Sequence, residues 1–113
     1  MTKHCIFCKI IKKEVPSNIV YEDDQVLAFK DIHPAAPTHV LVIPKEHLET
    51  VWDIPAGDPM ISVLADRAIK IAGQMGLREG FRLVINNGDN GGQTVYHLHL
   101  HLLGGRFMAW PPG

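Results

Sequence analysis

The fold is decided by a short segment in which histidine and leucine alternate, His97-Leu98-His99-Leu100-His101. Side chains alternate between the two faces of a β-strand, so the three histidines are expected to share one face. The even-numbered residues from Tyr96 to Leu102 are expected on the core side. Neighbouring imidazoles lower one another's pKa, which favours the neutral ring that attacks an electrophile or binds a metal.

Three interpretations of this histidine face remain open from the residues alone. It is a solvated strand face, a metal cluster, or a site of acyl or phosphoryl transfer through a histidine nucleophile. The stretch Asn90-Gly91-Gly92-Gln93-Thr94 just upstream favours transfer. Its glycines let the backbone approach a ligand, and its successive N–H groups can form an anion-binding nest. Taken alone, the same stretch is also typical of an ordinary hairpin loop.

The patterns around this segment predict an α+β fold, with a mostly antiparallel five-stranded sheet, one long helix and a short N-terminal helix. Strands are expected at residues 18–21, 25–30, 38–43, 81–86 and 94–103, a short helix at 5–13 and a helical turn at 46–51. The apolar run 38–43 is expected to be buried on both faces.

The long helix is expected at residues 58–75. Asp58 can cap it, Pro59 suits its first turn, and Gly76 can end it. Its apolar residues cover more of the helix surface than packing against a single core requires. This favours a second buried surface and hence a dimer.

Length and charge limit the classes of protein to which the chain can belong. Its 113 residues suffice for one domain and are too few for two. A formal net charge of -1 gives no reason to expect a nucleic-acid or anionic-membrane partner. No apolar run approaches the roughly 20 residues that span a bilayer, and the N-terminus lacks the features of a signal peptide. We therefore expect a cytoplasmic protein.

Cys5 and Cys8 are the only two cysteines. The pair reads as a redox pair, as half of a metal site, or as two small apolar residues of the short helix. A reducing cytosol disfavours a structural disulfide. The residues alone leave the other interpretations open.

The segment His-Leu-His-Leu-His-Leu-Leu fits the pattern His-φ-His-φ-His-φ-φ, where φ is apolar. On this motif the chain resembles the histidine triad (HIT) superfamily, and in particular its Hint branch. The resemblance covers nearly the whole chain, including residues 28–32, 36–45, 86–88 and 91–96 and the C-terminal Trp-Pro-Pro-Gly. It implies a single HIT domain over residues 1–113. It also implies a purine nucleoside phosphoramidase, which hydrolyses the P–N bond of adenosine or guanosine 5′-monophosphoramidates and needs no cofactor for catalysis.

The resemblance also assigns roles to individual residues. It implies His99 as the nucleophile that takes up the nucleotidyl group, with His101 hydrogen-bonded to the phosphate or leaving group and His39 orienting the catalytic histidines from behind. The remaining triad histidine, His97, is expected to serve structure. The implied nucleotide contacts are Asp31 for the ribose hydroxyls with Ile32 beside it, Asn86, the phosphate-binding Gly92, Gln93 and Thr94, and the base pocket of Ile6, Phe7, Phe29 and Leu41. Thr94 stands where the family often has serine, and both carry a hydroxyl.

Some bacterial relatives bind zinc through such a cysteine pair, together with the histidine of a Pro-Lys-x-His segment and the first triad histidine. The resemblance thus implies Cys5, Cys8, His47 and His97 as ligands here. Two thiolates and two imidazoles form a closed tetrahedral set, which is typical of a structural ion. Many Hint proteins lack the cysteines and fold without zinc, so both outcomes stay open.

The resemblance further implies a homodimer with one continuous sheet. Residues 104–113 then form a tail near the partner's active site, where Trp110 can touch the substrate. Two other functions are weighed against the enzyme. One is a nucleotide-binding regulatory module with incidental catalysis, and the other is a zinc hydrolase that uses the three triad histidines.

Overall fold

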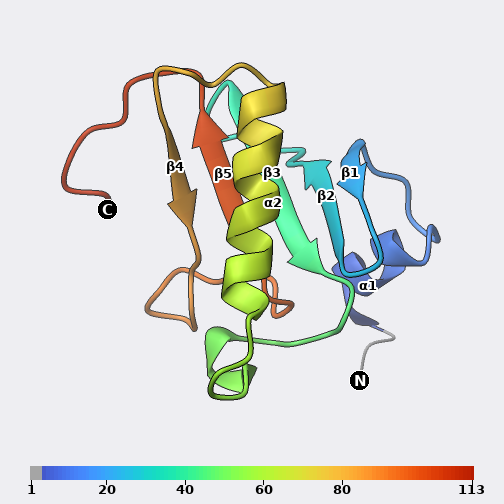
Figure 1. Cartoon of the computed structure of the whole chain (residues 1–113). Helices are drawn as coiled ribbons and strands as arrows, with labels where there is room; N and C mark the ends of the chain where they lie inside the picture. Colours follow the sequence, from blue (N-terminus) through green and yellow to red (C-terminus); the bar gives the residue numbers. More distant parts are fainter. Residues whose placement is uncertain (1–3) are drawn as a thin grey trace.

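The computed structural model describes residues 4–113 and contains one antiparallel five-stranded sheet with a helix on each face (Figure 1). Residues 1–3, part of the N-terminal segment expected to lack a signal peptide, lie outside the described residues. The strands are β1 (Ile19–Glu22), β2 (Val26–Lys30), β3 (Thr38–Pro44), β4 (Phe81–Val84) and β5 (Leu100–Gly104), in the order β1-β2-β3-β5-β4. The helices are α1 (Ile6–Ile11) and α2 (Met60–Gln74). The predicted fold class is confirmed. No helix within residues 4–113 has the length and apolar content needed to cross a bilayer.

The main core lies between α2 and one face of the sheet. Leu98, Leu100 and Leu102 are buried there against α2, as the alternation of the histidine segment predicts. The other residues of this core come from the sheet and from α2, namely Val26, Ala28, Val40, Val42, Met60, Leu64, Ala68, Ile71 and Ala72. Each fully buried leucine contributes about 1.5–3 kcal/mol of transfer free energy.

A second, smaller core lies on the opposite face, beneath α1. Phe7 and Ile10 of α1 pack on Leu27, Phe29, Leu41 and Ile43 of the sheet. Because β3 faces α2 with its even-numbered valines and α1 with Leu41 and Ile43, both of its faces are buried. The prediction from its continuous apolar run is confirmed.

The long helix begins two residues later than predicted. The Asp58 Oδ1 atom accepts the Met60 N–H at 2.9 Å, while Pro59 occupies the N-cap position rather than the first turn. Gly76, with φ +74°, follows the C-cap and ends the helix as expected. Ile61 and Ile69 remain exposed on α2, in agreement with the over-wide apolar face.

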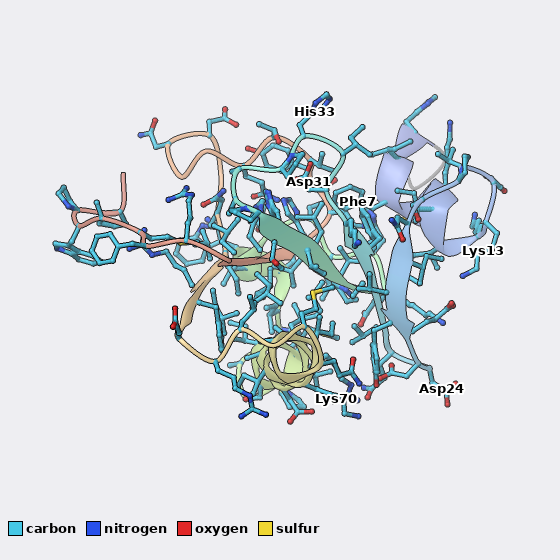
Figure 2. All side chains as sticks on the ribbon, turned by 90° about the horizontal axis from the view of Figure 1, so that it is seen from above. Phe7, Lys13, Asp24, Asp31, His33 and Lys70 are labelled. Carbon is cyan, nitrogen blue, oxygen red and sulfur yellow. The ribbon has the colours of Figure 1, made fainter. Side chains whose placement is uncertain are left out.

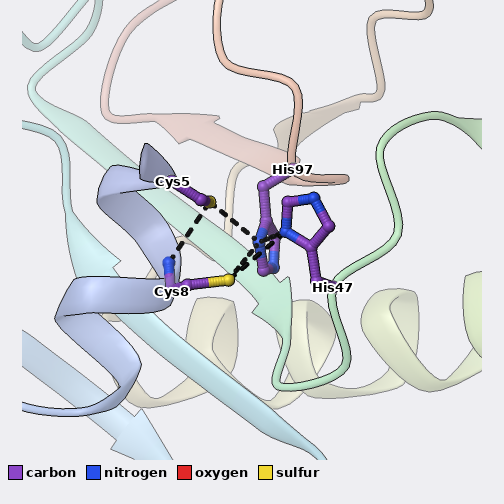
Figure 3. Close-up of side chains that lie close together, drawn as sticks. All are labelled: Cys5, Cys8, His47 and His97. Carbon is purple, nitrogen blue, oxygen red and sulfur yellow. Dashed lines mark hydrogen bonds between the residues drawn. The ribbon is translucent and has the colours of Figure 1, made fainter. Parts of the chain in front are cut away.

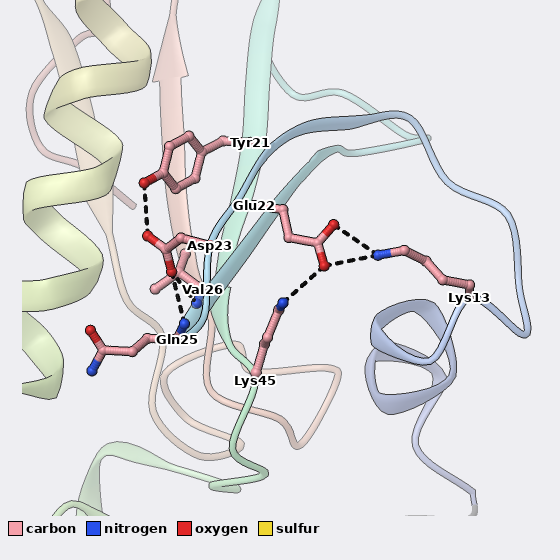
Figure 4. Close-up of polar contacts among 7 residues, drawn as sticks. All are labelled: Lys13, Tyr21, Glu22, Asp23, Gln25, Val26 and Lys45. Carbon is pink, nitrogen blue, oxygen red and sulfur yellow. Dashed lines mark hydrogen bonds and ion pairs between the residues drawn. The ribbon is translucent and has the colours of Figure 1, made fainter.

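Polar contacts fix the β1–β2 hairpin (Figure 4). The Asp23 carboxylate accepts hydrogen bonds from the N–H groups of Gln25 and Val26 and from the Tyr21 hydroxyl. It also accepts the Arg67 Nε–H at 2.7 Å, which ties the hairpin to α2. The burial of this carboxyl raises its pKa, but the hydrogen bonds from Arg67, Tyr21 and the two backbone groups outweigh that effect and leave the pKa well below its usual range.

Three local predictions are wrong. The strand predicted at 94–103 pairs only from Leu100 onward, since the Leu98 N–H donates to the Leu48 carbonyl at 2.6 Å instead of to a neighbouring strand. Tyr96, predicted on the core side, is exposed, and its hydroxyl is hydrogen-bonded to Asp89. The helical turn predicted at 46–51 does not form, and a 3₁₀ turn with Thr50 as its N-cap follows at Val51–Asp53.

Candidate active site

The triad histidines lie on the sheet face opposite α2, as predicted, although only His101 belongs to a strand. His97 is completely buried and His99 is 5% exposed. The ring of Phe7 meets both rings edge-on, with centroid distances of 5.8 Å to His97 and 5.2 Å to His99. In Figure 2, Phe7 and Asp31 lie on one side of the sheet, and α2 with Lys70 lies on the other. The histidines thus have an apolar wall on the α1 side.

His99 is held in a single tautomer. Its Nδ1 atom lies 2.7 Å from the His97 carbonyl oxygen, so Nδ1 carries the proton and donates it. Burial lowers the pKa of His99 despite the opposing effects of this hydrogen bond and of Asp31. The ring is therefore neutral at pH 7, with an unprotonated Nε2 that makes no hydrogen bond within residues 4–113. This is the state a nucleophilic histidine needs.

His101 is oriented by His39 through a chain of hydrogen bonds. The Ala35 N–H donates to His39 Nδ1 at 2.9 Å, so the proton of neutral His39 is on Nε2. That proton faces His101 Nδ1, also at 2.9 Å. The proton of neutral His101 must then lie on Nε2, a buried atom without a partner in the described chain. Burial, with smaller contributions from His99 and His39, lowers the pKa of His101 to about 4. His101 is thus a neutral donor that still lacks an acceptor.

Asp31 stands next to this chain of histidines. One carboxylate oxygen accepts the His33 N–H at 2.8 Å, and the other lies 3.5 Å from His39 Nε2. The carboxylate is partly exposed and can still accept hydroxyl groups. Ile32 beside it is 84% exposed.

The four apolar residues assigned to a base pocket belong to one region. Phe7 and Phe29 stack edge-on at 5.4 Å and share the smaller core with Leu41. Ile6, in the first turn of α1, is partly exposed. The structure gives no hydrogen bond of the Asn86 side chain within residues 4–113. A cavity of about 670 Å³ lies elsewhere, between residues 76–82 and residues 105–108.

The glycine-rich loop is not the open anion nest that its sequence predicts. The N–H groups of Gly91, Gly92 and Gln93 donate to the carbonyls of Gly88 and Asp89 in consecutive turns. Gly92 has φ +82°, which favours glycine at this position. Within residues 4–113, the N–H groups of Thr94 and Val95 make no hydrogen bond, so they and the exposed Thr94 hydroxyl remain available to an anion.

The buried side chain of Gln93 holds this loop together. Its Nε2 donates to the carbonyls of Glu49, at 2.7 Å, and Val95, at 3.1 Å, and its Oε1 accepts the Gly88 N–H. Asn87 adds a further contact, because its Oδ1 accepts the Val51 N–H at 2.9 Å. Gln93 therefore positions the loop rather than offering its amide to a phosphate. The importance of Glu49 and Asn87 could not be seen in the sequence, where they are ordinary polar residues.

Cys5, Cys8, His47 and His97 converge on one point, and we call them the Cys/His cluster (Figure 3). The His97 Nδ1 atom lies 3.4 Å from Cys5 Sγ, 3.6 Å from Cys8 Sγ and 3.1 Å from His47 Nδ1. A tetrahedral zinc ion, with Zn–S of about 2.3 Å and Zn–N of about 2.0 Å, separates an N and an S ligand by about 3.5 Å and two N ligands by about 3.3 Å. The cluster matches these separations.

The protonation of the cluster also fits a cation. The His97 Nε2 atom lies 2.9 Å from the Pro44 carbonyl and donates to it, which leaves a lone pair on Nδ1. Burial and the neighbouring Cys5 raise the pKa of Cys8 to about 11, so without a cation the thiol is protonated. His97, His99 and His101 do not form a common ligand set within residues 4–113, which counts against a zinc hydrolase at the triad.

Comparison with known proteins places this geometry in a family. The HIT domain family model matches residues 12–108. A 14 kDa zinc-binding protein of Zea mays is 54% identical over 111 residues, which cover 96% of this chain and 87% of the relative. The crystal structure of a HIT family hydrolase from Legionella pneumophila has a TM-score of 0.94 and 52% identity, covering 97% of this chain and 100% of that one. A histidine triad nucleotide-binding protein from Candida albicans has a TM-score of 0.82 and 37% identity, covering 95% and 82%.

Proposed function

The chain belongs to the HIT domain family, and we propose that it hydrolyses the P–N bond of purine nucleoside 5′-phosphoramidates through a nucleotidyl intermediate on His99. The proposal rests on the arrangement of two ring nitrogens, one of His99 and one of His101. The unprotonated Nε2 of His99 stands beside the buried, unpartnered Nε2–H of His101, with ring centroids 4.9 Å apart. A nucleophile next to a free donor suits in-line attack at phosphorus, where the oxygens gain charge.

The reaction has two displacement steps. In the first, His99 Nε2 forms a bond to phosphorus while the P–N bond of a substrate protonated on nitrogen breaks, so that a neutral amine leaves. In the second, water attacks phosphorus and the bond to His99 breaks. This step releases the nucleoside 5′-monophosphate and returns the neutral ring, with the proton of water passing to solvent. The His97 carbonyl holds the Nδ1 proton throughout and favours the charged ring of the intermediate.

The remaining site residues can contact the ribose, the phosphate and the base of one bound nucleotide. Asp31 accepts the ribose hydroxyls, because an ionised carboxylate is an acceptor only. The phosphate is met by His101 Nε2–H, the Thr94 hydroxyl and the free N–H groups of Thr94 and Val95. The base lies against the smaller core, at the residues the resemblance assigns to the base pocket: Ile6, Phe7, Phe29 and Leu41. Ile32, beside Asp31, and Asn86 are the further nucleotide contacts that the resemblance implies.

We also propose that the Cys/His cluster binds one structural zinc ion per subunit. Zinc would be held by the two thiolates and by Nδ1 of His47 and of His97, and it would hold the surrounding segments together without contacting the substrate. Elemental analysis of protein from zinc-replete cells tests this. We expect about one equivalent per subunit, which is lost in the Cys5→Ala/Cys8→Ala variant, and metal-free wild-type protein would count against it.

A homodimer is the proposed assembly. The exposed Ile61 and Ile69 of α2 and the edge strand β4 offer the surface for a continuous sheet. The tail passes outside β4, and its Phe107 and Trp110 are 88% and 81% exposed (Figure 1). Such exposure of two large aromatic rings fits a tail that reaches the partner's active site.

A turnover assay with adenosine and guanosine 5′-phosphoramidates of several amines tests the proposed activity. We expect the wild type to release nucleoside monophosphate, with and without a chelator, and His99→Ala to bind AMP without turnover. Substantial turnover by His99→Ala would refute the nucleophile. AMP binding without any turnover by the wild type would instead support a nucleotide-binding module, and complete loss of turnover on chelation would support a zinc hydrolase.

A further inference from the structure

Short hydrogen-bonded paths join the Cys/His cluster to the catalytic histidine and to the loop 87–95. We propose that the cluster is a positioning centre for the active site. Occupied by a zinc-type cation, it fixes His99 through the His97 carbonyl and orders the phosphate-binding loop through residues 47–51. The inference rests on the proposed nucleotide site, but not on the P–N bond as the bond that is cleaved.

The first path runs through His97. Its Nδ1 faces the cluster, and its Nε2 donates to the Pro44 carbonyl at 2.9 Å, so both ring nitrogens are held. The ring is completely buried. The carbonyl of the same residue accepts the Nδ1–H of His99 at 2.7 Å. A change in how the cluster holds the ring therefore moves the acceptor that sets the tautomer of His99.

The second path runs from His47 along the chain. The next residue, Leu48, accepts the Leu98 N–H with its carbonyl at 2.6 Å. The Glu49 carbonyl accepts the Gln93 Nε2–H at 2.7 Å, and the Val51 N–H donates to Asn87 Oδ1 at 2.9 Å. Residues 47–51 thus contact both ends of the loop 87–95.

Residues 47–49 form neither a helix nor a strand. Leu48 and the neighbouring Val51 pack against the edge of the main core, and the rest of the segment is held by these few hydrogen bonds and by His47 as its anchor in the cluster (Figure 3). Segments held by few contacts open at low cost. Loss of the anchor therefore loosens the segment and, with it, the loop that leaves the Thr94 and Val95 N–H groups free for a phosphate.

The rest of the fold is held independently. The main core lies on the α2 side of the sheet, away from the cluster, and Asp23 and Arg67 anchor the β1–β2 hairpin. A purely structural metal site would change the stability of the whole domain. A positioning centre changes residues 47–51, the loop 87–95 and nucleotide affinity more than it changes the hairpin.

Hydrogen exchange by residue and calorimetric titration with AMP test this inference on the full chain. The comparison uses zinc-loaded wild type, verified by elemental analysis, and the Cys5→Ser/Cys8→Ser variant. We expect faster exchange in residues 47–51 and 87–95 of the variant, unchanged exchange in the β1–β2 hairpin, and a Kd for AMP raised about tenfold. The ¹⁵N shift of His99 Nδ1 should also change, as a report on its hydrogen bond.

Two further variants separate positioning from general destabilisation. Asn87→Ala cuts the bond to Val51 without touching the cluster, so it should keep its zinc and yet loosen the same loop. Combined with the cysteine changes, it should raise Kd by less than the product of the two separate effects, because both act on one path. Arg67→Met is the matched control, which should lower Tm and leave loop exchange and AMP affinity unchanged.

Wild-type exchange in 87–95 together with wild-type AMP affinity in the cysteine variant would overturn the inference. The inference would also be overturned if the combined variant raised the Kd by the full product of the two separate effects, or if the wild-type protein contained no zinc. None of these measurements uses turnover. A chain that binds AMP and cleaves no phosphoramidate would refute the proposed function and leave this inference standing.

Discussion

The His39→Ala variant tests how the active site controls the proton of His101. In the wild type, His39 accepts the Ala35 N–H and donates to His101 Nδ1, each at 2.9 Å. Alanine removes both contacts. His101 Nδ1 is then free to take the proton, and Nε2 becomes an acceptor that faces the phosphate instead of a donor.

The expected loss follows from one hydrogen bond to a charged group. A donor to a phosphoryl oxygen is worth about 1.5–3 kcal/mol, and each 1.4 kcal/mol corresponds to a factor of ten. The His39→Ala variant should therefore lose roughly 10- to 100-fold in kcat. The KM should change less, because this charge develops in the transition state.

Steady-state kinetics with an adenosine 5′-phosphoramidate measure this loss, and His39→Gln is the matched variant. A glutamine can accept the Ala35 N–H with its oxygen and donate to His101 with its amide, so it should recover part of kcat. The melting temperature of both variants shows whether the fold is intact. Unchanged kcat in His39→Ala, or a folded glutamine variant no better than alanine, would refute this assignment of the proton.

Three other predictions address stability, the loop and the tail. Arg67→Met should destabilise the domain at pH 7, because it removes the ion pair with Asp23. The partners of Asp23 lower its pKa, so the stability difference between wild type and variant should persist down to about pH 4, near the ordinary pKa of an aspartate. It should shrink as the pH falls further. Urea unfolding at several pH values measures this difference. In Gly91→Ala, the new Cβ would lie 2.8 Å from the Asn87 backbone nitrogen, so the loop must shift and AMP affinity should fall in titration, whereas Gly73→Ala, whose Cβ meets nothing within 4 Å, should not change it. Deleting residues 110–113 should alter the preference among leaving groups more than Tm, and an equal loss on every leaving group with a lowered Tm would contradict a tail that touches the substrate.

The alternating pattern of residues 97–102 predicted which side chains face the core, and it did so for a physical reason. Leu98, Leu100 and Leu102 are buried against α2, and a shift by one residue would put imidazoles in that core. The same pattern overestimated the length of the strand. Only Leu100–Gly104 pairs with β3 and β4, because the Leu98 N–H is taken by Leu48.

The loop shows where sequence reasoning ends. Two adjacent glycines predicted a backbone open to an anion, yet the turns they permit satisfy the N–H groups of Gly91 and Gly92 internally. Gln93 looked like a phosphate ligand, but its buried amide bonds to Glu49, which is distant in sequence. Contacts of this kind depend on the tertiary arrangement and leave no periodic signal. The Cys/His cluster was predicted only through the resemblance, because His47 lies far along the chain from Cys8.

Rapid-quench mass spectrometry with an adenosine 5′-phosphoramidate tests most directly whether His99 is the nucleophile. The protein is stopped within one turnover, digested under conditions that preserve phosphohistidine, and mapped for an adenylyl group. We predict one adduct, on the ring of His99, formed and lost at rates that match turnover, and no adduct in His99→Ala. An adenylyl group on another residue, or turnover without any adduct on His99, would contradict the mechanism.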